Sequence, residues 1–235
     1  MGSTIQWREP PDDRTNRSTG EMVSFGKHRD AGRGYMARSE RVGPGVLVLH
    51  EFFGLQDSFV AYADRLNRAG FTVLVPDLYD GEIASSVDAA TALARSLDRD
   101  ATMRKLRAAA DLLTANWHPR LGVVGFSLGA DLAVELAALR PIEALVVYYG
   151  TGSLGDGRWN GPTLGHFAEN DEWTPLSEAE AAFDALEAAD VDAELIAYPG
   201  LGHWFANAAV IDSYDAEADA AAFEATSEFL HHHLA

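Results

Sequence analysis

Short apolar runs alternate with longer amphipathic stretches along most of the chain. The runs are rich in Val and Leu and end near Gly or Pro, which is typical of buried strands. The intervening stretches repeat apolar residues every three or four positions, which predicts helices. The expected strands are 46–49, 71–75, 122–126, 144–149, 163–168 and 193–198, and the expected helices are 59–69, 87–116 with a break near 97–100, 128–139, 177–189 and 215–232.

Strands that alternate with helices predict an α/β fold in which a mostly parallel sheet is covered on both faces. Segments 22–27 and 34–38 flank the turn-prone Asp30-Ala31-Gly32, and they predict a short antiparallel pair at the sheet edge. Residues 1–20 are polar and are expected to form an irregular arm, and residues 21–235 a single domain. Ligand sites in such sheets lie at the carboxyl ends of strands, so polar residues that directly follow strands are the candidates for function.

Composition narrows the classes of function. The 235 residues include no Cys, which excludes disulfides, thiolate metal sites and a cysteine nucleophile. The net charge of −18, with Lys27 and Lys105 as the only lysines, disfavours nucleic acids and anionic membranes as partners. No run approaches the roughly 20 apolar residues of a membrane span. The N-terminal stretch also lacks the apolar segment of a signal peptide, so we expect a cytoplasmic protein.

The nucleophile candidate is Ser127, in Gly125-Phe126-Ser127-Leu128-Gly129. This G-x-S-x-G string lies between an expected strand and an expected helix, the setting of a nucleophile elbow. The flanking glycines remove side chains that would clash in so tight a turn. A glycine-rich turn without catalytic function is the alternative interpretation.

A serine hydroxyl needs a base within hydrogen-bond reach, and the chain has eight histidines. Among them, His203 stands in a glycine-rich loop between the last expected strand and the last expected helix. In hydrolases with a nucleophile elbow, the residues follow the order Ser, acid, His, and His203 fills the last place. His231, His232 and His233 are interpreted as the natural end of the last helix.

The acid that orients the base should follow the preceding strand, where Glu169-Asn170-Asp171-Glu172 stands. We predict Asp171, with Glu169 and Glu172 as competitors. Its carboxylate would hold the imidazole tautomer and stabilise the imidazolium.

Several motifs together resemble the dienelactone hydrolase family. They are His50-Glu51-Phe52-Phe53-Gly54-Leu55, Pro76-Asp77-Leu78-Tyr79, the Ser127 elbow, Asp171-x-x-x-Pro175 and Gly202-His203-Trp204-Phe205. The resemblance runs from about residue 20 to the C-terminus. It implies a compact α/β-hydrolase fold with little or no lid, and backbone amides of Phe52 and Leu128 as the oxyanion hole. It also implies that Glu51 is an active-site glutamate that contacts the nucleophile in the resting enzyme.

The chain departs from this family at three places. Serine replaces the cysteine nucleophile of the type member, and bulky Trp204 follows His203. The arginines that bind a substrate carboxylate in the type member are absent from Asp80-Gly81-Glu82 and Ala206-Asn207-Ala208. Neutral esters therefore fit better than an anionic lactone. The expected substrate pocket is aromatic and includes Phe53, Tyr79, Trp173 and Trp204.

The sequence thus predicts a serine hydrolase that cleaves small neutral carboxylic esters through an acyl-enzyme. No metal or organic cofactor is expected, and the chain is expected to be a monomer or a small homo-oligomer. The alternatives are a dienelactone or other lactone hydrolase, hydrolysis of small amides, acyl transfer to an alcohol, and a non-catalytic binding protein on a hydrolase scaffold.

Overall fold

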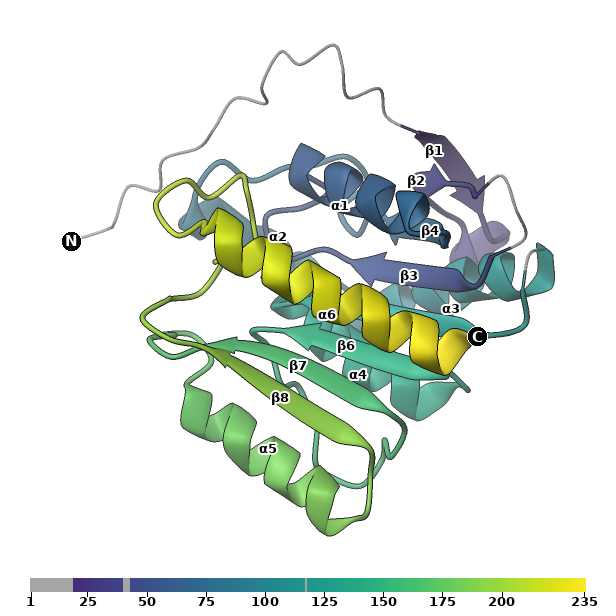
Figure 1. Ribbon diagram of the computed structural model, residues 1–235. Helices are drawn as coiled ribbons and strands as arrows, with labels where there is room; N and C mark the ends of the chain where they lie inside the picture. Colours follow the sequence, from purple (N-terminus) through teal and green to yellow (C-terminus); the bar gives the residue numbers. More distant parts are fainter. Residues whose placement is uncertain (1–18, 40–42, 117) are drawn as a thin grey trace.

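One sheet of eight strands organises the chain in a computed structural model that describes residues 19–39, 43–116 and 118–235 (Figure 1). The strand order is β1-β2-β4-β3-β5-β6-β7-β8. β1 and β2 pair antiparallel, as do β2 and β4, and the other neighbours are parallel. The strands are β1 (Gly20–Phe25), β2 (Gly32–Ala37), β3 (Gly45–Leu49), β4 (Thr72–Pro76), β5 (Leu121–Phe126), β6 (Ala144–Tyr148), β7 (Thr163–Ala168) and β8 (Ala193–Tyr198).

Helices cover both faces of the sheet. α1 and α6 pack on one face, and α3, α4 and α5 pack on the other, as the two hydrophobic cores show. Figure 1 shows α6 crossing in front of the sheet, with α3 and α4 fainter behind it. The helices are α1 (Asp57–Arg68), α2 (Val87–Ser96), α3 (Arg99–Asn116), α4 (Leu128–Leu139), α5 (Leu176–Ala188) and α6 (Ala216–Leu234), with a 3₁₀ turn, η1 (His28–Asp30), between β1 and β2.

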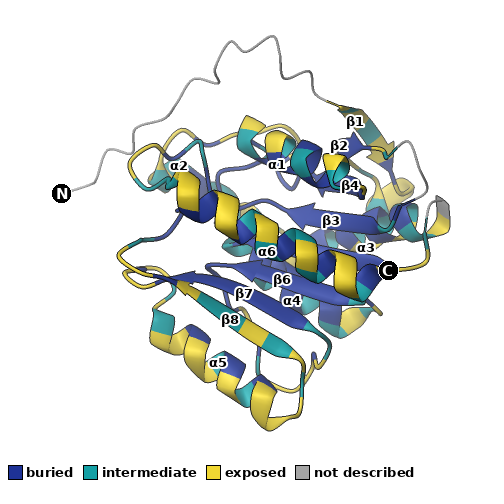
Figure 2. Ribbon diagram, in the orientation of Figure 1, coloured by how far each residue is buried: buried dark blue, intermediate teal, exposed yellow. Residues whose placement is uncertain are grey.

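The central strands are buried on both faces, so they contain continuous apolar runs in place of an apolar–polar alternation (Figure 2). In β3, Val46 and Val48 belong to the core under α1 and α6, whereas Leu47 and Leu49 belong to the core under α3 and α4. Successive side chains of a strand point to opposite faces, which explains this division. The edge strand β8 is mostly half-buried or exposed.

These features confirm the predicted fold class and the antiparallel edge pair. Most strands and helices begin and end within two residues of the predicted bounds, and the predicted break near 97–100 separates α2 from α3. The expected arm falls largely on residues 1–18, which lie outside the described residues, and β1 begins at Gly20. No helix in the described ranges is both long and apolar enough for a bilayer crossing.

Candidate active site

The turn from β5 into α4 presents Ser127 in a conformation that its neighbours make possible. The φ angle of Ser127 is 51°, in the left-handed region that non-glycine residues rarely adopt. A Cβ at Gly125 would lie 2.3 Å from the carbonyl oxygen of Gly129, and one at Gly129 would lie 2.1 Å from that of Leu49. Both glycines are therefore required for the turn to pack against β3. Such a strained serine is typical of a nucleophile elbow.

A continuous hydrogen-bonded series joins Ser127, His203 and Asp171. His203 Nε2 lies 3.0 Å from Ser127 Oγ, and His203 Nδ1 lies 2.7 Å from Asp171 Oδ2. Because a carboxylate only accepts hydrogen bonds, Nδ1 carries the proton, and Nε2 is left to accept from the serine hydroxyl. The imidazole and the Asp171 carboxylate are almost fully buried. The series therefore has the order and the tautomer that a serine nucleophile requires.

The loop after β7 fixes the Asp171 carboxylate. Its Oδ1 accepts the backbone N–H groups of Trp173 at 2.7 Å and Thr174 at 2.9 Å, which leaves Oδ2 for His203. The two other candidates for the orienting acid, Glu169 and Glu172, do not contact His203. Glu172 is exposed, and Glu169 is exposed and accepts the N–H of Gly200 at 2.7 Å. The structure thus brings Asp171 to the histidine and leaves the two glutamates at the surface.

The two amides expected to form an oxyanion hole lie in adjacent loops. Leu128 is the first residue of α4, where an amide has no acceptor within the helix. Phe52 lies in the turn after β3, and His50 fixes this turn. Nδ1 of His50 donates to the Glu51 carbonyl at 2.7 Å, while Nε2 accepts the Leu78 N–H at 3.2 Å. Burial lowers the pKa of His50 to about 4, so the ring stays neutral and can serve as both donor and acceptor.

Glu51 does not make the contact with the nucleophile that the family resemblance implied. Its Oε1 accepts from Asn207 Nδ2 at 2.6 Å, and its Oε2 lies 3.4 Å from the Tyr149 hydroxyl, which faces it as donor. The Ser127 hydroxyl is occupied by His203. Asn207 also donates to Gln56 Oε1 at 3.2 Å. Glu51 therefore links the turn after β3 to the loop that carries His203.

The Glu51 carboxyl is fully buried among neutral partners. Burial raises its pKa from 4.5 to about 8, and the hydrogen bonds from Asn207 and Tyr149 offset only part of this shift. Near neutral pH the folded protein thus holds Glu51 protonated. A protonated carboxyl keeps lone pairs on both oxygens, so it still accepts from Asn207 and Tyr149.

Replacing Glu51 with Gln should stabilise the protein in alkaline solution relative to the wild type. The folded pKa is raised, so below pH 4.5 the carboxyl is protonated in both states and carries no penalty. Between pH 4.5 and about 8, the unfolded chain releases a proton that the folded protein retains, and wild-type stability falls by up to about 1.4 kcal/mol per pH unit. Glutamine keeps the shape and the acceptor but does not titrate.

Urea unfolding of both proteins from pH 4 to pH 9 measures this difference. The advantage of the Glu51→Gln variant should grow through the window and level off above pH 8. Glu180→Gln, at an exposed position of α5, is the matched control and should show no such trend. A difference that is independent of pH would mean that Glu51 is ionised in the folded protein.

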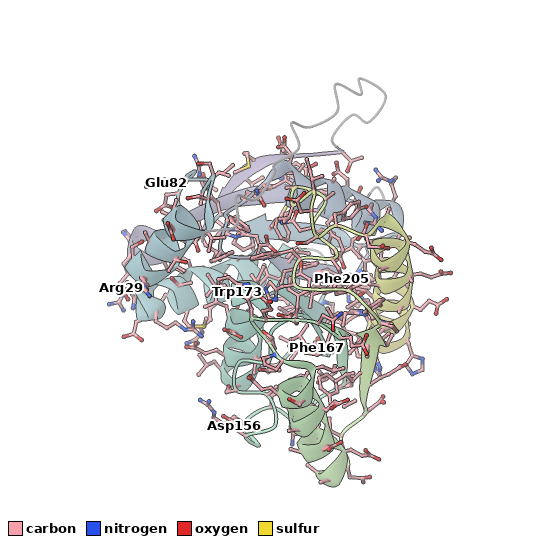
Figure 3. All side chains as sticks on the ribbon, turned by 90° about the vertical axis from the view of Figure 1, so that its left-hand side faces the viewer. Arg29, Glu82, Asp156, Phe167, Trp173 and Phe205 are labelled. Atoms are coloured by element: carbon pink, nitrogen blue, oxygen red, sulfur yellow. The ribbon has the colours of Figure 1, made fainter. Side chains whose placement is uncertain are left out.

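Two tryptophan rings pack against His203 at the carboxyl end of the sheet, and Phe52 packs on both of them. The centroid of Trp204 lies 4.9 Å from the imidazole and that of Trp173 6.1 Å from it. Phe52 packs 5.7 Å from Trp173 and 6.0 Å from Trp204. Trp173 is 53% exposed, and Figure 3, which views this end of the sheet, shows it near the middle. These rings border the position where a substrate would meet the triad.

Phe53 and Tyr79 were predicted to line the pocket, but both belong mainly to the cores. Phe53 is fully buried and supports Phe52 and Trp204 from behind, at 4.5 and 5.7 Å between ring centroids. Phe52 remains 8% exposed and also contacts Trp173, so it borders the site, whereas Phe53 does not. Tyr79 packs into the core under α3, although its hydroxyl is buried without a hydrogen-bond partner. The Trp204 Nε1 is also buried without a hydrogen-bond partner.

Two contributors to the site were missed in the sequence. Tyr149 lies directly after β6 and packs its ring 4.7 Å from that of His203. The sequence pattern places Tyr149 within the expected strand 144–149. The expectation that functional polar residues follow strands could have identified it. Asn207 was noted only as a position without arginine. No sequence pattern pairs it with Glu51, which lies 156 positions away.

No group of three or more His, Asp or Glu that could hold a metal ion occurs among the described residues. Two hollows of about 370 Å³ lie away from the triad. One is bordered by α4 and Arg158, and the other by β1 and Ile83.

Comparison with known proteins agrees with the fold and identifies the family. Residues 33–234 match the family model described as the dienelactone hydrolase family. The chain belongs to the dienelactone hydrolase family. A protein of Aquifex aeolicus, provisionally named a carboxymethylenebutenolidase, is 28% identical over 92% of this chain and 99% of its own length. Protein usf of Aquifex pyrophilus is 30% identical over 83% of this chain and 91% of its own length.

Solved structures with similar folds include hydrolases and esterases. A dienelactone hydrolase from Anabaena variabilis superposes with a TM-score of 0.73 at 22% identity, covering 94% of this chain and 100% of that one. Est1E from Butyrivibrio proteoclasticus gives 0.67 at 15% identity, covering 90% and 98%. At the level of the family, this protein is thus a hydrolase of the dienelactone hydrolase and esterase type.

Proposed function

We propose that this dienelactone hydrolase family member cleaves small carboxylic esters without negative charge, through an acyl-enzyme on Ser127. The observation that supports the proposal most is the hydrogen-bonded series from Asp171 through His203 to Ser127, in which both distances are 3.0 Å or less. A nucleophile, a base and an orienting acid arranged in this order are the parts that acyl transfer needs.

In the first step, Ser127 Oγ attacks the ester carbonyl carbon as its proton moves to His203 Nε2. The Phe52 and Leu128 amides stabilise the oxyanion, and each such donor contributes about 10²–10³ in rate. The tetrahedral intermediate then expels the alcohol, which takes the proton from His203. In the second step, His203 activates water, which attacks the acyl-enzyme and releases the acid. Asp171 stays ionised throughout and stabilises the imidazolium.

The charges around the site favour substrates without a carboxylate. Four loops around the triad, residues 51–57, 78–84, 169–175 and 199–209, contain no Lys or Arg. The loop after β6 contains Arg158, which pairs with Asp156 at 2.6 Å. Arg33, the basic residue that reaches toward the loop after β4, is paired with the buried Asp77 at 2.9 Å. A substrate carboxylate would lose its hydration in this site without gaining a cationic partner.

Short acyl chains should be preferred over long ones. Phe126, next to Ser127, is 1% exposed and Tyr149 is fully buried, so packed rings fill the space behind the nucleophile. Hydrolysis of p-nitrophenyl esters from acetate to decanoate, measured as kcat/KM, tests this expectation. Acetate or butyrate should exceed decanoate by at least about tenfold, since a long chain would have to displace packed rings.

A flat or rising profile would show that the rings leave a long acyl channel. Failure to hydrolyse any ester of the series would contradict the proposed function and favour a binding role. Quenched-flow mass spectrometry adds a direct readout, because an acyl group should accumulate on the peptide that contains Ser127.

A further inference from the structure

The ring cluster formed by Phe52, Trp173 and Trp204 lies on one definite side of the proposed reaction. Two of its members pack against His203, at 4.9 Å for Trp204 and 6.1 Å for Trp173. His203 must deliver its proton to the departing alcohol, so the alcohol leaves beside the imidazole. The exposed part of the ring cluster therefore contacts the alcohol half of an ester, while the acyl half extends away from His203.

The ring cluster has the composition of a cation-binding surface. Ring faces carry negative quadrupole potential, and tryptophan is the most favourable ring for a cation placed over it. Trp173 is 53% exposed, so a face of its ring remains available from solvent. Figure 3 shows it at the centre of this end of the molecule. A quaternary ammonium group suits such a surface because it is weakly hydrated and loses little when it leaves water.

The charges near the ring cluster have the matching sign. Glu172 is the neighbour of Trp173 in the chain and is exposed, and Glu169 lies in the same loop. Two basic side chains pair with acidic residues of the loop after β4: Arg33 with Asp77 at 2.9 Å, and Lys105 with Asp80 at 3.3 Å. Negative potential at the mouth of a cleft raises the local concentration of a cation and speeds its encounter.

We propose that the ring cluster, with Glu172 beside it, selects esters whose alcohol half carries a quaternary ammonium group. This inference rests on the proposed ester hydrolysis and names the substrate class of that same site. A neutral alcohol of the same shape buries the same area but gains nothing from the ring quadrupoles or the acidic loop. The discrimination between two such alcohols measures the electrostatic part alone.

Acetylcholine and 3,3-dimethylbutyl acetate form the required matched pair. They differ in a single atom, since a carbon of the second replaces the charged nitrogen of the first, and both release acetic acid. Initial rates by pH-stat give kcat/KM for each. We expect a ratio of about three- to tenfold in favour of acetylcholine, the range that a partly exposed cation–π contact supports. Equal rates, or a faster neutral ester, would overturn the inference.

Two variants assign the preference to its sources. Trp173→Leu removes the ring but keeps an apolar side chain, and it leaves the backbone amide that Asp171 accepts. The ratio should fall to about one in this variant. Glu172→Gln should lower the ratio by less, and Glu180→Gln, an equal change of charge on exposed α5, should leave it unchanged. An unaltered ratio in Trp173→Leu would refute the role of the ring.

Hydrolysis of p-nitrophenyl acetate separates this inference from the proposed function. If the wild type cleaves p-nitrophenyl acetate and shows no preference for acetylcholine, only the cation selection is wrong. If it cleaves none of the three esters, the proposed function fails and the inference fails with it. Thermal unfolding of each variant establishes that the compared proteins are folded.

Discussion

Ser127→Ala should lower kcat for p-nitrophenyl acetate by about 10⁵–10⁶-fold, the loss found when the nucleophile of a serine hydrolase is removed. The variant retains the oxyanion donors and the binding surface but has no atom to form the acyl-enzyme. The recorded contact of Ser127 Oγ is with His203 at 3.0 Å, so its removal should hardly change stability. Steady-state hydrolysis and thermal unfolding, measured on the same preparation, test both expectations.

Ser127→Cys is the informative comparison. A thiol fits the same elbow and has its own nucleophilicity, so this variant distinguishes loss of the nucleophile from damage to the turn. Ser127→Ala activity above about 1% of the wild type would place the nucleophile elsewhere. Activity only in the cysteine variant would show that the surroundings are adapted to a thiolate.

Asp171→Asn should lower kcat by about 10⁴-fold while the fold stays intact. The physical reason lies in the loop. One carboxylate oxygen accepts two backbone amides, from Trp173 and Thr174, and only a carbonyl oxygen can replace it. The asparagine amide nitrogen must then face His203 Nδ1 and donate to it. The imidazole consequently shifts its proton to Nε2, where it can no longer accept the proton of Ser127.

The pH profile and a charge control complete this test. Asp184→Asn makes the same chemical change at an exposed position of α5 and should leave kcat within about twofold of the wild type. Asp171→Asn activity should rise with pH, because hydroxide can partly replace the missing base. If Asp171→Asn retained most of the activity, Asp171 would only support the loop, and the orienting acid would have to be sought elsewhere.

Most of the fold could be predicted from local pattern. The runs that became β3, β5 and β6 are apolar because both faces of the sheet are covered. Gly125 and Gly129 are required by close contacts of one turn with the start of α4 and with β3. The three triad residues could be predicted from local pattern as well. They are Ser127, Asp171 and His203. Each lies within five residues of the end of a strand, and parallel strands present their carboxyl ends at one edge.

The sequence pattern could not show which of several neighbouring side chains contacts the active site. Phe52 and Phe53 are the same residue type in adjacent positions, yet only Phe52 borders the site and contacts Trp173. The role of Glu51 depends on Asn207, whose loop meets the turn after β3 only once the sheet has formed. Such contacts are decided by packing between distant segments, and no periodicity in the sequence encodes them.

The return of α6 to the middle of the sheet has a consequence for how the enzyme is made. A Cβ at Gly122 in β5 would lie 2.7 Å from a methyl of Leu230 and 3.0 Å from one of Leu234, so the strand that leads to Ser127 packs directly on the last helix. During synthesis, domains fold as their segments emerge, N-terminal parts first. Until α6 leaves the ribosome, β5 would lack its packing partner on one face. Catalytic activity should therefore appear only after the whole of α6 has left the ribosome.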